Sequence, residues 1–147
     1  QLLALLQQNA KFTTKALSLQ LNLSVTAVYE RIKKLERQEV ITGYTTLLNK
    51  EVLQLGFMVF CHIKLVKHSE ENIVKFEAAI KQLPEVMECF HVSGDYDYLL
   101  KVLVEDMDHF RRFMVTELTR IEHIGSTTSS FTINEVKNEI ALPLKSL

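Results

Sequence analysis

The sequence contains few of the residues that mark linkers, phosphate loops and disulfide frameworks. Its 147 residues include four glycines and two prolines, too few for a low-complexity linker or a glycine-rich phosphate loop. The two cysteines, Cys61 and Cys89, are too few and too far apart for a disulfide framework or a four-ligand zinc site. We therefore expect reduced core residues at both positions and no metal site.

Long apolar runs are also missing. No run approaches the roughly 18 residues needed to cross a bilayer, and the first residues lack the basic-then-apolar pattern of a secretory signal. We expect a cytoplasmic protein with no membrane partner. Hydrophobic residues still make up 47% of the chain, which is enough to fill the core of one ordinary domain or two small ones.

The chain has no large excess of charge of either sign, since its formal net charge is -1, and this alone argues against a nucleic-acid partner. The charge is unevenly distributed, however. Residues 1–49 hold six basic and three acidic residues, a net +3, and the remainder holds eleven basic and fifteen acidic residues, a net -4. Opposite signs in two parts are typical of a polyanion-binding module joined to a module that must not bind polyanions.

The residue types that act in catalysis are present without the spacing that catalysis needs. The histidines show no HExxH pairing, the cysteines have no adjacent base, and GxSxG is absent. Asp95 and Asp97 alternate across an extended strand, while Asp106 and Asp108 suit the start of a helix better than a magnesium site. We expect no catalytic residues and no cofactor.

The basic first part has the spacing of a helix-turn-helix. The chain begins inside a helix over residues 1–8, and a second helix is expected over 14–21. Asn22 ends it, because Asn tolerates the left-handed conformation of a helix exit, and Ser24 can cap a third helix over 25–38. Two helices joined by about three residues, the second longer and basic, are typical of this motif.

The third helix has an apolar stripe, and its polar face suits DNA. At about 100° per residue, the stripe contains Val25, Val28, Ile32 and Leu35. The first residues of a recognition helix reach base edges, and later Lys and Arg lie near phosphates. We predict a DNA-binding set with the base-reading residues Thr26, Ala27, Tyr29 and Glu30, the backbone-contacting residues Arg31, Lys33, Lys34 and Arg37, and Ser24. The alternatives are that these charges only solvate the helix, or that Glu30 pairs with Lys33 or Lys34.

The segment after this helix, VITGYTTLLN over residues 40–49, alternates apolar and polar residues around Gly43. This pattern predicts a two-stranded wing or a single strand.

The sequence resembles the Lrp/AsnC, or feast/famine, family of transcription regulators. The resemblance lies in LNLSVTAVYERIKKLERQEVITGYTTLLN and later in VSGDYDYLLKV, in the family's order and over nearly the whole chain. Asn22 stands where the family usually has Gly, and the residues that the family usually has before the first helix are missing. The resemblance implies double-stranded DNA as a partner, a sensing domain for an amino-acid effector, and dimers that assemble further into octamers.

In the second part the apolar period changes to that of alternating strands and helices. Expected are strands at 57–65, 86–93, 98–104 and 127–136, and helices at 70–83 and 108–120. Two strand-helix-strand units predict a βαββαβ, ferredoxin-like α+β sandwich of the RAM ligand-sensing type, with an antiparallel four-stranded sheet. The expected domains are a winged helix-turn-helix over 1–49, a linker over 50–56, and a sensing and oligomerisation domain over 57–147.

The sheet of such a sandwich has one face without helices, and here that face is apolar. It is expected to carry Met58, Phe60, Leu99 and Leu103. Large apolar patches seldom stay wet, so we predict that these residues form the interface of a homodimer. A dimer also suits a helix-turn-helix that reads two half-sites about 34 Å apart or a multiple of that distance.

The polar run SGDYDY over residues 93–98 is either an ordinary hairpin turn or a small-molecule site. Glycine lets the backbone approach closely, backbone N–H groups hold a carboxylate, and an Asp meets an ammonium group. The resemblance implies an effector site here between neighbouring dimers, and the residues carried over are Gly94, Asp95, Tyr96 and Asp97, together with Ser126, Thr127 and Thr128 before the last strand.

These features predict a sequence-specific DNA-binding transcriptional regulator whose assembly and DNA binding respond to an amino acid. The alternative is an amino-acid-binding regulatory subunit that acts on an enzyme through protein contacts, without DNA.

Overall fold

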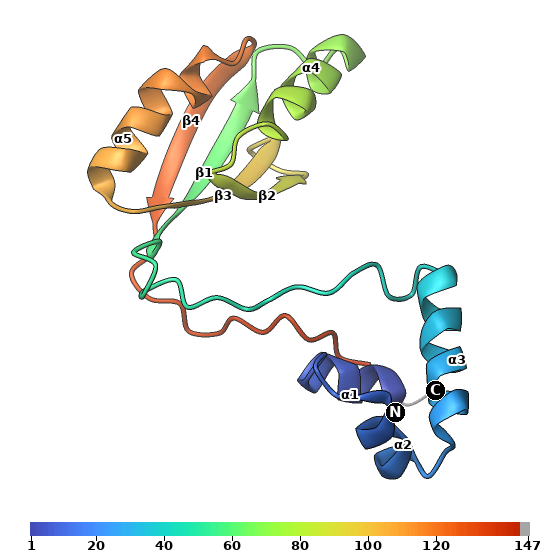
Figure 1. Cartoon of the computed structure of the whole chain (residues 1–147). Helices are drawn as coiled ribbons and strands as arrows, with labels where there is room; N and C mark the ends of the chain where they lie inside the picture. Colours follow the sequence, from blue (N-terminus) through green and yellow to red (C-terminus); the bar gives the residue numbers. More distant parts are fainter. Residues whose placement is uncertain (145–147) are drawn as a thin grey trace. The chain divides into compact units, whose positions relative to one another are not determined.

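The computed structural model describes residues 1–144, which form two compact units (Figure 1). One unit contains residues 1–47 together with residues 136–144, and the other contains Leu48–Glu135. The segment 50–56, expected as a linker, is grouped with the second unit. Residues 136–144 lie with the N-terminal helices, because the backbone of Leu142 forms two hydrogen bonds with the side-chain amide of Gln7.

The N-terminal unit contains the three expected helices, α1 (Leu2–Gln8), α2 (Thr14–Leu21) and α3 (Val25–Arg37). The hydroxyl of Thr13 accepts the backbone N–H of Ala16 at 3.1 Å, and the hydroxyl of Ser24 accepts that of Ala27 at 3.1 Å. These are N-cap bonds, which satisfy donors that have no partner inside the helix. Asn22 has φ 52° and ψ 49°, so the predicted left-handed exit from α2 is confirmed.

A small core joins these three helices. Leu2, Leu17 and Val28 are buried, with Ile32 and Leu35 packed against them. Val25 was predicted to belong to this stripe, but that prediction is wrong, since the residue is 46% exposed. Helical side chains lean toward the N-terminus, so the first residue of α3 projects beyond the part of the helix that meets a neighbour.

The strand or wing expected over residues 40–49 is not formed within the chain. Residues 42–49 have no regular structure. A strand requires a neighbouring segment for its backbone hydrogen bonds, and no part of the chain within residues 1–144 pairs with this one. The apolar residues of its alternating pattern, Tyr44 and Leu47 among them, are therefore exposed.

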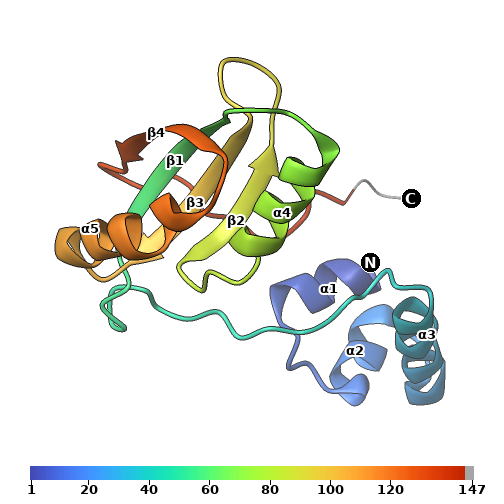
Figure 2. The ribbon, with the colours of Figure 1, turned by 90° about the horizontal axis from the view of Figure 1, so that it is seen from above.

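The second unit is a βαββαβ sandwich, as the sequence predicts. Its elements are β1 (Phe57–Leu65), α4 (Glu70–Ile80), β2 (Val86–His91), β3 (Tyr98–Val104), α5 (Met107–Thr116), the short 3-10 helix η1 (Leu118–Arg120) and β4 (Ile124–Phe131). The strands lie in the order β2-β3-β1-β4 and every pairing is antiparallel. Helices α4 and α5 cover the same face of the sheet (Figures 1 and 2), which makes this the predicted α+β sandwich.

Some element ends differ from the sequence-based expectation. Helix α4 ends at Ile80 rather than residue 83, and β2 ends at His91 rather than residue 93. The helix expected over 108–120 is interrupted at Glu117, so that α5 ends at Thr116 and the 3-10 helix η1 follows to Arg120. The last strand covers 124–131 rather than 127–136, because its register is set by β1, whose Val59 and Leu65 lie opposite Phe131 and Ile124.

The core of this unit lies between the sheet and the two helices. Its members include Val59, Cys61, Phe76, Tyr98 and Leu100, and the rings of Phe76 and Tyr98 are 4.6 Å apart. Burial raises the pKa of the Cys61 thiol, as expected of a core cysteine. Cys89 was expected in the core as well, but it is exposed because β2 is an edge strand. None of the helices within residues 1–144 has the length and apolar character to span a membrane.

Candidate functional site

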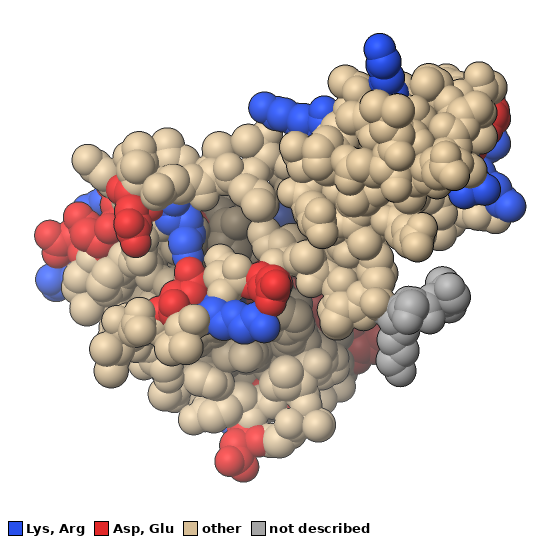
Figure 3. Space-filling model, turned by 90° about the horizontal axis from the view of Figure 1, so that it is seen from below, with Lys and Arg blue, Asp and Glu red and all other residues tan. Residues whose placement is uncertain are grey.

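The polar face of α3 is the first candidate site. Thr26, Tyr29 and Glu30 are exposed along its first two turns, and Ala27 beside them is half-buried. Arg31, Lys34 and Arg37 are exposed on later turns, and none of them forms an ion pair with another residue of the described range 1–144. On the face shown in Figure 3, the lobe formed by this unit carries mainly basic side chains. These cations are available to phosphate groups.

One predicted phosphate contact, Lys33, already has a partner. Its Nζ lies 2.8 Å from Glu36 Oε2, and the hydroxyl of Tyr44 donates to the other carboxylate oxygen at 3.1 Å. These two hydrogen bonds lower the pKa of Glu36, and the first of them raises the pKa of Lys33. The ammonium of Lys33 also lies 5.8 Å from the centre of the Tyr29 ring. Lys33 is therefore fixed against α3 and is less free than Lys34 or Arg37.

The sequence interpretation missed Glu36 and Tyr44 in this network. The three-residue spacing of Lys33 and Glu36 is the usual signal of a helical ion pair and could have identified it. The part played by Tyr44 could not be read in the same way, since it depends on the path of the chain after α3. Burial, followed by the hydrogen bond to Glu36, raises the pKa of Tyr44.

The second candidate site lies at one end of the uncovered face of the sheet. The ring of Tyr96 is 4.9 Å from that of His62, and His62 Nδ1 lies 3.4 Å from the carbonyl oxygen of Thr128. In the β1–β4 register His62 is opposite Thr128, and Lys64 is opposite Ser126. Predicted residues from two distant parts of the chain are thus brought together around His62, a residue that was not among those predicted for this site.

The loop between β2 and β3 extends beyond the end of the strands (Figure 2). In it Gly94 has φ 132°, a conformation that side-chain-bearing residues rarely adopt, and Asp95 is exposed. Thr127 is the predicted residue that does not share the uncovered face. It lies opposite the buried Ile63, so its side chain points to the face covered by the helices.

Asp97 was predicted to bind the effector. Within the chain, both oxygens of its carboxylate already have hydrogen-bonding partners. One oxygen accepts the backbone N–H of Leu65 at 2.7 Å, and the other lies 2.7 Å from His68 Nε2. The hydrogen bond from Leu65 is the main cause of a lowered pKa for Asp97. The residue joins the start of β3 to the end of β1, and so holds the loop before it in position.

The residues predicted for a dimer interface lie on the same uncovered face. Met58 is opposite Leu103 in the register, and Leu99 is opposite His62. Phe60, Leu99 and Leu103 are half-buried, and Met58 is 7% exposed in the single chain. The apolar end and the polar end of this face are therefore continuous. Within residues 1–144 no three His, Cys, Asp or Glu side chains come together as a metal site would require.

Comparison with known proteins identifies both units. Residues 58–142 match the family model of the Lrp/AsnC ligand binding domain. The chain belongs to the Lrp/AsnC family. Residues 1–42 match the model of a winged helix-turn-helix DNA-binding domain, so this Lrp/AsnC protein has the two-part organisation of a transcriptional regulator rather than that of an enzyme.

Curated relatives and solved structures of the Lrp/AsnC family agree with this assignment. The leucine-responsive regulatory protein of Haemophilus influenzae is 42% identical over 95% of this chain and 84% of its own length. That of Escherichia coli K12 is 37% identical over 95% and 85%. A Neisseria meningitidis regulator solved with L-Met is 31% identical, with a TM-score of 0.91 over 97% of this chain and 92% of its own. An AsnC-family regulator from Agrobacterium tumefaciens is 32% identical, with a TM-score of 0.92 over 97% of this chain and 92% of its own.

Proposed function

We propose that this Lrp/AsnC protein binds specific DNA sequences through α3 and that an amino acid bound at the polar end of the uncovered sheet face changes its DNA binding. The observation that carries the proposal is the cluster of Tyr96, His62 and Thr128 beside the Gly94–Asp95 loop. It lies in a chain whose α3 also presents free cations.

The loop and its neighbours offer the groups that an α-amino acid needs. Asp95 is exposed and can meet the ammonium group, and the backbone N–H groups around Gly94 can hold the carboxylate. Tyr96 supplies an aromatic wall for the side chain. The solved relative from N. meningitidis contains L-Met, and the curated relatives are named for leucine, so methionine and leucine are the first effectors to test.

The apolar part of the uncovered face suggests how a ligand could act on DNA binding. We propose that Met58, Phe60, Leu99 and Leu103 form a homodimer interface, with further assembly toward an octamer through the loop region. An amino acid bound near that loop would favour one assembly over another, and the assembly would determine which half-sites are bound together. The protein would act in the cytoplasm, where the DNA is.

The DNA-binding part is tested by selecting duplexes from a random pool and measuring binding at about 0.15 M salt, where nonspecific contacts weaken. We expect enrichment of a sequence with two related half-sites and tighter binding to it than to random duplex. Equal binding to both would contradict sequence-specific recognition and would favour a regulatory subunit that acts through protein contacts.

The effector part is tested by calorimetry and thermal unfolding of the full chain with each of the twenty amino acids. We expect binding and a raised melting temperature for at least one apolar amino acid, because a ligand that binds only the folded state stabilises it. Asp95→Ala should abolish this effect without altering the fold, since Asp95 is exposed. Glu51→Ala is a matched control on the same unit, and binding that survives Asp95→Ala would contradict the proposed site.

A further inference from the structure

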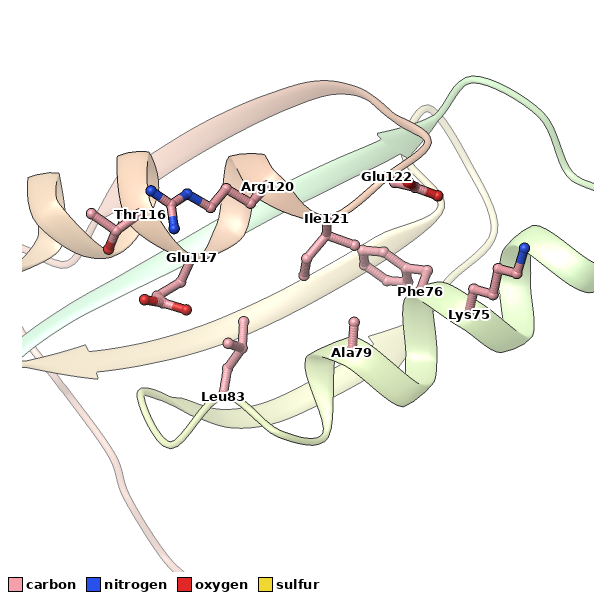
Figure 4. A pocket seen from close by; sticks show the side chains of 9 residues that line it. All are labelled: Lys75, Phe76, Ala79, Leu83, Thr116, Glu117, Arg120, Ile121 and Glu122. Carbon is pink, nitrogen blue, oxygen red and sulfur yellow. The ribbon is translucent and has the colours of Figure 1, made fainter.

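A cavity of 380 Å³ lies on the helix-covered side of the sheet, between α4 and the segment formed by the end of α5 and η1 (Figure 4). Cavities of roughly 300–1,000 Å³ are typical of small-molecule sites. This cavity belongs entirely to the sandwich unit and lies on the helix-covered face of the sheet, whereas His62 alternates with the buried Cys61 and Ile63 and so lies on the uncovered face. It is therefore separate from the effector site proposed above.

The floor of the cavity is apolar. Phe76 and Ala79 contribute from α4, Leu83 from the turn after it, and Ile121 from the segment after η1. In Figure 4 the side chains of Ala79, Leu83 and Ile121 point into the space between the two helical segments. Phe76 is fully buried and the others are half-buried, so the floor remains accessible to an apolar group.

Two opposite charges at one end of the cavity have no partner within residues 1–144. Glu117 and Arg120 are exposed, and neither forms an ion pair or a side-chain hydrogen bond with another described residue. The backbone N–H of Arg120 donates to the carbonyl of Glu117 at 3.2 Å, which sets the two residues one tight turn apart. In Figure 4 the carboxylate of Glu117 extends toward Leu83, while the guanidinium of Arg120 runs along the rim toward Thr116.

At the other end of the cavity the cation is already engaged, while the carboxylate is largely exposed. Lys75 Nζ lies 2.6 Å from Glu71 Oε1, and Glu122 Oε2 lies 3.8 Å from His123 Nε2. Of the two cations that line the cavity, Arg120 is therefore the one without a partner among residues 1–144, and Glu117 lies one tight turn from it. One carboxylate and one guanidinium together match a head group that carries an ammonium and a carboxylate on the same carbon atom.

We propose that this cavity binds an α-amino acid with a large apolar side chain, as a second site of the same chain. The guanidinium of Arg120 would donate two hydrogen bonds to the ligand's carboxylate, and the carboxylate of Glu117 would accept a hydrogen bond from its ammonium group. The side chain would then lie over Phe76, Ala79, Leu83 and Ile121, where it loses contact with water. The proposal depends on residues that the loop site does not use.

The test is calorimetry of the full chain with L-phenylalanine, L-methionine and L-leucine, for the wild type and for Glu117→Gln, Arg120→Gln and Asp95→Ala. We expect two bound molecules per chain in the wild type. Arg120→Gln or Glu117→Gln should weaken one of them by roughly tenfold or more, since each removes a charge-assisted contact, and should leave the other unchanged. Both residues are exposed, so the variants should fold normally.

Arg111→Gln is the matched control, because Arg111 is an exposed arginine of the preceding helix α5 and lies outside the cavity. It should leave both binding events intact. 3-Phenylpropionate and phenethylamine, which each lack one of the two charges, should bind the cavity at least about tenfold more weakly than L-phenylalanine. Methyl resonances of Leu83 and Ile121 should shift on titration in the wild type and in Asp95→Ala.

The possible failures are distinguishable. A single binding event that is lost in Asp95→Ala and kept in Arg120→Gln would overturn the second site and leave the proposed effector site standing. A single event lost only in Arg120→Gln would support the cavity and contradict the loop site. Binding of all three amino acids that is insensitive to Glu117→Gln and Arg120→Gln, or no binding at all, would overturn the inference.

Discussion

Asn22 is a residue that determines how two helices meet. It adopts the left-handed conformation with φ 52°, and its backbone N–H donates to the carbonyls of Ser18 and Leu19 at the end of α2. Residues with a Cβ pay a conformational cost in this region, which Asn reduces and Gly avoids. The turn between α2 and α3 thus depends on the chemistry of one side chain.

We expect Asn22→Ala to lower the free energy of unfolding by about 1 kcal/mol, because alanine occupies the left-handed region less readily than asparagine. Asn22→Gly should leave it unchanged or raise it slightly. Urea unfolding of both variants measures the difference. Equal stability of the alanine variant and the wild type would show that the turn is not held by this conformation.

The hydrogen bonds of the Asp97 carboxylate make the stability of the fold depend on pH. Its carboxylate accepts the N–H of Leu65 and contacts His68, and its pKa is lowered chiefly by the first of these bonds. A carboxyl group with a lowered folded-state pKa contributes stability above its unfolded pKa of about 3.9, and this contribution is lost as the pH falls through the folded-state value.

Asp97→Asn should therefore destabilise the chain by about 1.5–3 kcal/mol at pH 7, the usual range for a hydrogen bond to a charged group. The difference from the wild type should shrink below about pH 3.9. Urea unfolding at pH 7 and pH 3 measures this, with Asp95→Asn as a control at an exposed neighbouring position. A difference of the same size at both pH values would contradict the role given to the carboxylate.

At the scale of a single element, we propose that the first turns of α3 read bases and that its last turn contacts phosphates. Ser24 caps its first turn, and Lys34 and Arg37 occupy its last turn. Cations near the C-terminal end of a helix also interact favourably with the helix dipole. The same two residues can therefore stabilise α3 before DNA is bound and contact phosphates afterwards.

Arg37→Ala should weaken binding to specific and random duplex by similar factors and reduce the slope of log K against log salt by about 0.9, the loss of one phosphate contact. Glu30→Gln should instead change the preferred sequence and leave the salt slope intact. Fluorescence titrations at several salt concentrations measure both quantities. Equal losses from the two variants on every duplex would contradict the division of the helix.

The accuracy of the sequence-based predictions varied with the pattern of each element. Strands β1 and β3 were predicted at their observed bounds because buried residues alternate along them with little interruption. Strand β4 was placed too late, since its serine and threonine residues show no apolar alternation and its position depends on pairing with β1. The role of Asp97 could not be predicted, because it depends on Leu65, which lies 32 residues away in the sequence.

At the scale of the whole molecule, the proposed homodimer depends on the uncovered sheet face. A lysine at its centre would have to be buried without a partner in a dimer, at a high cost in free energy. Leu103 is half-buried there, opposite Met58. A lysine placed on the uncovered face should therefore disrupt a dimer, whereas a lysine on the helix-covered side should not.

Leu103→Lys should convert the proposed dimer to a monomer in sedimentation equilibrium and remove cooperative binding to paired half-sites. Val115→Lys is the control, because Val115 is exposed on α5, on the other side of the sheet. We expect the control to keep the mass of the wild type. A dimer that persists in Leu103→Lys would mean that the chains associate through another surface.

The two hydrogen bonds between Gln7 and Leu142 make the helical unit discontinuous in sequence. All of residues 48–135 lie between its two parts. During synthesis on the ribosome, α1, α2 and α3 are therefore complete long before the segment that contains Leu142 is translated. The sandwich must emerge before Leu142 reaches Gln7, so the DNA-reading part of a newly made chain reaches its final form only after the sensing part has been made.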